Sequence, residues 1–332
     1  MWFEDLTGFT ETSPEEVRQK FSVSGDTLTS LANGKSYTFG RLEIPTLAEL
    51  RQRAETISFE PDYISLREVV ANVQTLHLDP IYHGAFFQAA SQFNLLEMTS
   101  PRVTPEEGVG IYEYDRTQGP ACAIAAGAGT IYRNYFAEVK GQIGQSASLQ
   151  IDCLEDIGMA LGNTNDQLWH TQNGYALASE EGLARISATL QSMSEEEIDA
   201  LRGKLRIGLQ WNTQVTLNQC THLVTQAYCS ALPVGYSPHS SQAWENFARL
   251  VLEATYEATL AAAALNFQAT GNDQVFLTLV GGGVFGNEWP WIREAIERAL
   301  KLYAAFPLDV SMVSYGSSNE QVREMIRAGR WK

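Results

Sequence analysis

The segment from residue 274 to residue 303 constrains the fold of this chain more than any other. It begins with QVFLTLV (274–280), an uncharged and largely apolar run. It continues through the glycine-rich GGGVFGN (281–287) and ends in EWPWIREAIERALKLY (288–303), an amphipathic pattern. An apolar run of this kind is typical of a strand buried on both faces. Such a strand needs helices above and below its sheet, so the segment predicts a layered α/β fold.

Other segments extend this pattern along the chain. Strands are predicted at 84–93, 206–216, 222–235 and 308–315, and the strongest predicted helix covers 240–268. The order strand, helix, strand, glycine loop, helix, strand favours a mostly parallel sheet with helices on both faces. A further helix is predicted over 118–136, because its Gln-Gly-Pro start suits a first helical turn. We interpret 1–64 as a helical and irregular N-terminal extension and 65–332 as the main domain.

Composition excludes several classes of partner. The chain has 332 residues, 44% of them hydrophobic, and a formal net charge of −16. Nucleic acids and anionic membrane surfaces attract clustered Lys and Arg, so neither is expected to bind this acidic chain. The first residues lack the pattern of a secretory signal, no apolar run is long enough to span a membrane, and the four cysteines form no CxxC pair. We therefore expect an intracellular, cytoplasmic protein.

The glycine loop 281–287 is the sharpest chemical feature of the sequence. Glycines after a buried strand let a ligand approach the backbone, and successive N–H groups before a helix form an anion site. Gly281, Gly283 and Gly286 also satisfy GxGxxG, which leaves a Rossmann-type dinucleotide or nucleotide-sugar enzyme as an alternative. A third interpretation is a turn that only allows close packing of strand and helix.

The second half of the chain resembles the second half of a macrodomain. The resemblance rests on YEATLAAAAL (256–265), QVFLTLVGGGVFGN (274–287) and LDVSMVSYG (308–316). It implies a three-layer α/β/α fold with a mixed, mostly parallel sheet, in which the loop after the buried strand wraps the diphosphate of ADP-ribose. The implied ligand-binding residues of this loop are Gly281, Gly282, Gly283, Val284, Phe285, Gly286 and Asn287.

The first half of the chain carries a similar resemblance. GAFFQAASQFN (84–94) is similar to the macrodomain strand that ends in an asparagine facing the distal ribose, and TQGPACAIAAGAGTIYRNYF (117–136) is similar to the following loop and helix. The resemblance implies that Gln92, Phe93, Asn94, Gln118 and Gly119 bind the ligand, together with Ser230 at the end of YCS. The Gln-Glu-Glu run of the poly(ADP-ribose) glycohydrolase branch is absent. The whole combination looks most like a divergent class that removes mono-ADP-ribose from arginine.

Cleavage of an N-glycosidic bond to ribose requires a carboxyl group close to the reacting carbon. The candidate catalytic acids are Glu97, Asp115, Asp152, Asp156 and Glu288. Each also has a structural interpretation as a helix cap, a helix-dipole partner or a solvated loop charge, and the sequence does not choose among them. The expected partners are ADP-ribose and an ADP-ribosylated protein, with no cofactor and no metal site. A reader module that binds ADP-ribose without turnover is the alternative.

Overall fold

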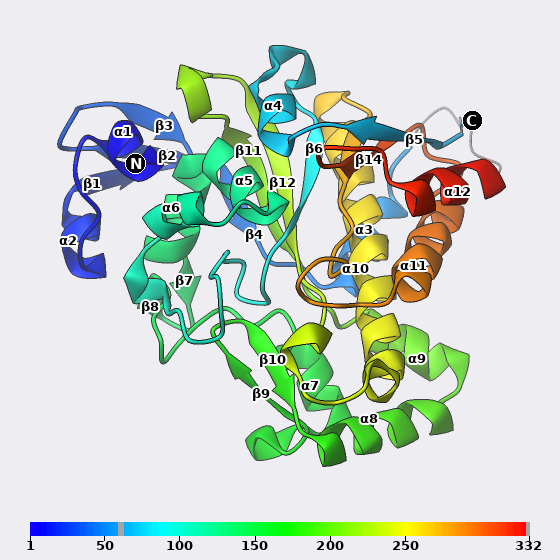
Figure 1. The fold of residues 1–332 in the computed structure, drawn as a ribbon. Coiled ribbons are helices and arrows are strands. Elements are labelled where there is room, and N and C mark those ends of the chain that lie inside the picture. Colours follow the sequence, from blue (N-terminus) through cyan, green and yellow to red (C-terminus); the bar gives the residue numbers. More distant parts are fainter. Residues whose placement is uncertain (59–62, 330–332) are drawn as a thin grey trace.

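The fold is built around one seven-stranded sheet (Figure 1). A computed structural model describes residues 1–58 and 63–329. The strand order is β4-β11-β12-β6-β13-β14-β5. These strands are β4 (Arg41–Glu43), β5 (Ser65–Val70), β6 (Phe86–Ala90), β11 (Gly208–Gln214), β12 (Leu223–Cys229), β13 (Gln274–Leu277) and β14 (Asp309–Ser314). β11 pairs antiparallel with both of its neighbours, and every other pair is parallel, so the predicted mixed, mostly parallel sheet is confirmed.

Helices cover both faces of this sheet and complete three layers. One face carries α4 (Val73–Leu78), α5 (Gln118–Ala125) and α6 (Gly127–Tyr135), and the other carries α3 (Leu47–Ala54), α10 (Ser241–Thr270) and α11 (Trp289–Leu302) (Figure 1). Successive side chains of β6 point to opposite faces of the sheet and contact the helices on each face. Phe87 stacks on His77 of α4 with ring centroids 3.8 Å apart, whereas the side chain of Gln88 donates to Thr259 Oγ1 of α10 at 2.8 Å.

The N-terminal segment contributes a strand to the main sheet. It contains α1 (Trp2–Thr7), α2 (Pro14–Gln19) and a small sheet of β1 (Phe21–Ser24), β2 (Thr27–Ser30) and β3 (Ser36–Thr38). β4 then pairs with β11, and α3 packs against α10. The extension is therefore richer in strands than the sequence indicated. The boundary at residue 64 stays a prediction, although the segment before it shares the sheet of the segment after it.

A second group of elements lies between α6 and β11, below the sheet in Figure 1. It comprises β7 (Glu138–Val139), β8 (Gln142–Ile143), α7 (Glu155–Leu161), β9 (Trp169–Gln172), β10 (Tyr175–Ala178), α8 (Glu180–Ser192) and α9 (Glu195–Arg202). Short 3-10 turns are η1 (Pro80–Tyr82), η2 (Pro105–Glu107), η3 (Gly110–Tyr114), η4 (Thr164–Asp166), η5 (Leu217–Gln219) and η6 (Val234–Tyr236). α12 (Glu320–Ala328) packs against the edge strand β5.

Two predicted elements differ from the structure for local reasons. The helix predicted over 118–136 breaks at Ala126, because Thr216 donates its N–H to Ala125 O at 2.9 Å and accepts from Gly127 N through Oγ1 at 2.9 Å. The predicted strand 274–280 ends at Leu277. The next backbone N–H, that of Thr278, donates to the side chain of Gln88 at 3.2 Å.

Among residues 1–58 and 63–329, no helix combines the length and apolarity needed to cross a lipid bilayer.

Candidate functional site

A cavity of about 220 Å³ lies where the loops after β6 and β13 meet the start of α5. β6 and β13 are parallel neighbours, so both loops leave the sheet at its carboxyl edge, where open α/β sheets bind ligands. Residues from 90–99, 115–119 and 278–285 line the cavity, together with Tyr175 and Tyr236. The structure therefore brings the predicted glycine loop and two of the predicted acids into one site.

Glu97 is the buried acid of this cavity. Its exposed fraction is 3%, and its Oε1 has no hydrogen-bond partner among the described residues. Burial raises its pKa well above the usual range of a glutamate. The nearby Arg133 guanidinium opposes this shift, and the Asp115 carboxylate adds to it. Glu97 is therefore held protonated to higher pH than an exposed glutamate, which suits a proton donor.

The start of α5 closes tightly over Glu97. A Cβ at Gly119 would lie 2.1 Å from Ala90 O and 2.5 Å from Glu97 Oε2, so only glycine fits at this position. The neighbouring Gln118 accepts a hydrogen bond from Val73 N at 2.8 Å, which fixes its amide at the cavity wall. The predicted positions 118 and 119 therefore lie beside the buried acid.

Asp115 is the second acid that lines this cavity. Its Oδ1 accepts a hydrogen bond from Thr117 N at 2.8 Å. Unlike Glu97, it is partly exposed, so it can face both solvent and a bound ligand. The described residues that line the cavity include no Lys, Arg or His.

The glycine loop presents free backbone donors to the cavity. Within the loop, Asn287 N donates to Gly281 O at 2.9 Å and Gly286 N donates to Gly283 O at 3.0 Å. The N–H groups of Gly283, Val284 and Phe285 have no acceptor among the described residues, and all three residues line the cavity. Three successive free donors before α11 make a site for an anion that needs no basic side chain.

Two tethers hold the glycine loop in place. At its start, the hydroxyl of Tyr256 on α10 accepts from Val280 N and donates to Thr278 O, each at 2.9 Å. At its end, Asn287 donates from Nδ2 to Leu232 O at 2.8 Å. Asn287 is buried and does not line the cavity, so its contact with the loop is structural.

Three aromatic rings form one wall of the cavity. Tyr175, Tyr236 and Phe285 pack with ring centroids 5.1 to 5.7 Å apart. The Tyr175 hydroxyl also donates to Met98 O at 2.8 Å, which links β10 to the segment that carries Glu97. Such a wall can pack against a base or a sugar ring.

Several residues predicted to bind ligand lie outside the cavity lining. Asn94 is fully buried and donates to Gln150 Oε1 at 2.8 Å, while Phe93 and Ser230 are buried and do not line the cavity. Gln92 lines the cavity, with its Oε1 bonded to Met98 N at 2.8 Å. The predicted loop residues Gly282 and Gly286 belong to the glycine loop without lining the cavity, and Glu288 is exposed at the start of α11.

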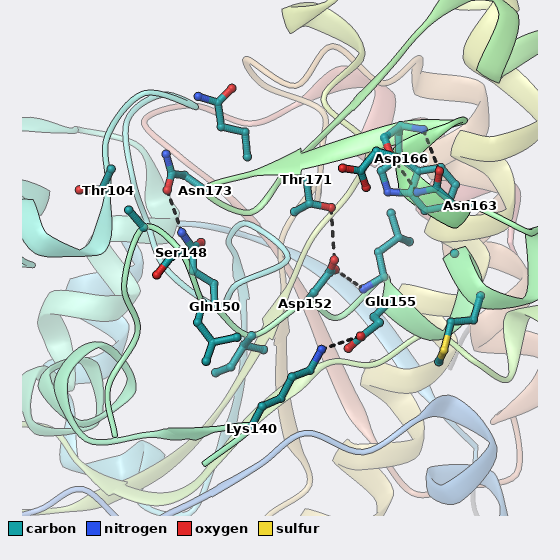
Figure 2. Close-up of a pocket in the computed structure, with 18 of the residues that line it drawn as sticks. Thr104, Lys140, Ser148, Gln150, Asp152, Glu155, Asn163, Asp166, Thr171 and Asn173 are labelled. Atoms are coloured by element: carbon teal, nitrogen blue, oxygen red, sulfur yellow. Dashed lines mark hydrogen bonds and ion pairs between the residues drawn. The ribbon is translucent and has the colours of Figure 1, made fainter. Parts of the chain in front are cut away.

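The predicted acids at 152 and 156 lie elsewhere. Asp152 lines a second cavity of about 630 Å³ beside α7 and β9 (Figure 2). There it accepts hydrogen bonds from Leu154 N at 2.9 Å and Thr171 Oγ1 at 3.2 Å, and burial raises its pKa. Asp156 forms an ion pair with Arg206 at 2.8 Å. The structure therefore separates both acids from Glu97 and from the glycine loop.

The comparisons with known proteins give structural neighbours only. No family model and no curated protein matches the sequence. Poly(ADP-ribose) glycohydrolase from Thermomonospora curvata is 12% identical, with a TM-score of 0.46 over 95% of this chain and 94% of that chain. The enzyme from Deinococcus radiodurans in complex with ADP-ribose is 11% identical, with a TM-score of 0.42 over 86% of this chain and 92% of that chain. Similarity at this level assigns neither activity nor substrate, so the chemistry rests on the residues of the cavity.

Some residues of the cavity carry no signal in the sequence. Tyr175 and Tyr236 come from segments far from the glycine loop, and only the tertiary structure brings them to it. Tyr236 stands in YCSALPVGYS, next to Gly235, whose N–H donates to Phe285 O at 2.8 Å. Tyr175 follows Asn173 and Gly174 at the start of β10, and no pattern in the surrounding sequence indicates a ligand.

Proposed function

We propose that this protein binds ADP-ribose in the cavity between β6, β13 and α5. We further propose that it hydrolyses the N-glycosidic bond joining mono-ADP-ribose to a protein side chain. One observation carries the proposal: the unpartnered carboxyl group of Glu97 and the free N–H groups of Gly283, Val284 and Phe285 share one cavity. An anion site beside a buried proton donor suits a ligand that joins a diphosphate to a cleavable ribose bond.

The two acids then have different roles. As the bond from C1″ to nitrogen breaks, its electron pair goes to the leaving nitrogen, which takes the proton of Glu97. Water adds to C1″ and gives a proton to Asp115, so the net reaction consumes one water. Solvent then returns the proton from Asp115 to Glu97. The different exposure of the two acids supports this division, because burial favours the protonated form of Glu97, whereas Asp115 is partly exposed and can receive a proton from water.

Arginine is the side chain that we expect to be released. Its guanidinium is cationic, and a cavity with the partly exposed acid Asp115 and no Lys, Arg or His among its described lining residues favours a cationic group over an acidic one. The protein partner in this proposal is therefore a mono-ADP-ribosylated protein modified on arginine. The proposal requires no cofactor.

The decisive experiment is incubation of the protein with peptides that carry mono-ADP-ribose on Arg, Ser or Glu, followed by quantification of free ADP-ribose. We expect release from the arginine-linked peptide at the highest rate. Absence of release from all three peptides, with retained affinity for ADP-ribose, would indicate the reader module instead. Tighter binding of NAD(P) than of ADP-ribose would favour the dinucleotide enzyme.

A further inference from the structure

A glutamate of the N-terminal segment is built into the loop that supports the buried acid. Glu11 follows α1, and its carboxylate accepts hydrogen bonds from Val109 N at 2.9 Å and from Gly110 N at 2.6 Å. The same group accepts from the Tyr135 hydroxyl of α6 at 2.7 Å. One carboxylate therefore joins two segments that are each more than 90 residues from Glu11 in the sequence.

The loop is shaped to receive this carboxylate. A Cβ at Gly108 would lie 2.5 Å from the Glu11 carboxylate, and a Cβ at Gly110 would lie 2.6 Å from its Oε2. Gly108 also adopts a φ of +86°, which other residues rarely adopt. Two glycines that flank the donor N–H of Val109 thus admit the carboxylate, and a side chain at either position would have to displace it.

The held loop continues directly to the proposed catalytic residues. Tyr112 lies two residues after Gly110, is fully buried, and accepts a hydrogen bond from Glu97 N through its hydroxyl at 3.0 Å. Asp115 N in turn donates to Tyr112 O at 3.2 Å. The position of Tyr112 therefore fixes the backbone of one acid and the start of the turn that carries the other.

We infer that Glu11 is a positioning residue, which holds the loop 105–115 so that Tyr112 keeps Glu97 and Asp115 at the cavity. The inference rests on the proposed function. It assigns a role in turnover to a segment that lines no part of the cavity. The glycine loop 281–287 has its own tethers on α10 and at Leu232, so ADP-ribose binding does not depend on Glu11.

The test compares Glu11→Gln and Glu11→Ala with the wild type. Glu11→Gln keeps the size of the side chain but puts an NH2 group opposite an N–H donor. Glu16→Gln, an exposed acid on α2, is the matched control. We expect Glu11→Gln to lower kcat at least tenfold, with KM and the Kd for ADP-ribose within twofold of wild type. Amide exchange in 108–113 should accelerate at least tenfold, and Glu16→Gln should change none of these values.

Several results would overturn the inference. These are an unchanged kcat, unchanged exchange in the loop, or a parallel loss of kcat and ADP-ribose affinity, which would indicate general unfolding. If Glu11→Ala does not fold, Glu11→Gln alone decides.

A second readout separates this inference from the proposed function. If the wild type releases no ADP-ribose, the proposed function fails. The role of Glu11 is then tested by following the titration of the Glu97 carboxyl group by NMR. Loosening the loop admits water, so we expect the pKa of Glu97 to fall in Glu11→Gln, and an unchanged pKa would overturn the inference. The titratable and charged groups around Glu97 are Tyr112, Asp115, Cys122, Arg133, Tyr175 and Tyr228.

Discussion

At the scale of single residues, Glu97 is the most informative side chain of the molecule. Burying a carboxyl group without a hydrogen-bond partner for one of its oxygens destabilises a fold by about 1–3 kcal/mol. Glu97 is such a group, and it lies in the wall of a cavity that free backbone N–H groups of the glycine loop also line, not in the hydrophobic core. A destabilising polar group at the wall of a ligand cavity is typical of a functional group.

Replacing Glu97 by Gln should greatly slow turnover and preserve binding. The amide keeps the shape of the carboxyl group but has no acidic proton, so we expect the release of ADP-ribose to slow by about 10²–10⁴-fold. ADP-ribose affinity by calorimetry should stay within about threefold, because the glycine loop is unchanged. Glu181→Gln, an exposed acid on α8, is the control and should match wild type. Turnover of Glu97→Gln near the wild-type rate would exclude Glu97 as the proton donor.

The raised pKa of Glu97 also predicts how stability depends on pH. The folded protein keeps this proton to higher pH than the unfolded chain, so the free energy of unfolding that it contributes is fully present below about pH 4.3 and is lost as pH rises through the folded pKa. The loss is at most about 1.4 kcal/mol per pH unit. Thermal unfolding of wild type and Glu97→Gln between pH 4 and pH 8 measures it. The Tm of wild type should fall relative to that of Glu97→Gln as pH rises, and a constant difference would contradict burial of the proton.

At the scale of elements, the glycine loop works because different glycines meet different constraints. Gly281 has a φ of +79°, and a Cβ there would lie 2.6 Å from Ala231 Cβ, so this glycine shapes the loop. Gly283 has no atom within 4 Å of the position of a Cβ, so its outer face is open. The first glycine serves the fold, and the second leaves room for a ligand.

This difference gives a matched pair of variants at one position. Gly283→Ala adds a methyl group in open space and should leave ADP-ribose affinity within about twofold. Gly283→Glu brings a carboxylate to the proposed diphosphate site and should weaken binding at least tenfold, since like charges at this distance repel. Calorimetry with ADP-ribose measures both. Equal affinity of the two variants would show that the diphosphate binds elsewhere.

At the scale of the whole molecule, the net charge of the protein and the charge of the proposed ligand have the same sign. The net charge is −16, ADP-ribose is anionic, and the described lining residues of the cavity include no Lys, Arg or His. The proposed binding of ADP-ribose would therefore depend on short-range donation from backbone N–H groups and not on long-range attraction.

Salt should accordingly accelerate the binding of ADP-ribose. Mobile ions screen the repulsion between an acidic protein and an anionic ligand, so we expect the association rate constant to rise severalfold between about 20 and 200 mM salt. Stopped-flow fluorescence of the cavity aromatics measures this rate. A phosphate site built on Lys or Arg would show the opposite trend. A fall in the association rate constant with salt would therefore contradict a diphosphate site made of backbone N–H groups.

Parts of the fold followed from local patterns alone. The apolar strands at β6, β13 and β14, the long helix α10 and the glycine loop each have a signal within a few residues, because hydrophobic periodicity and glycine conformations are local properties. The break at Ala126 has no such signal, since the side chain that divides the two helices is Thr216, 90 residues further along the chain.

The sequence by itself determined the layered α/β class, the place of the glycine loop and a set of five candidate acids. Only the tertiary structure decided which acids share a cavity with that loop, because burial and proximity depend on residues distant in sequence. Glu97 and Asp115 meet the loop at the carboxyl edge of the sheet, whereas Asp152 lies in another cavity and Asp156 is paired with Arg206. Glu11 carries no signal in the sequence, because its role consists entirely of contacts with Val109, Gly110 and Tyr135.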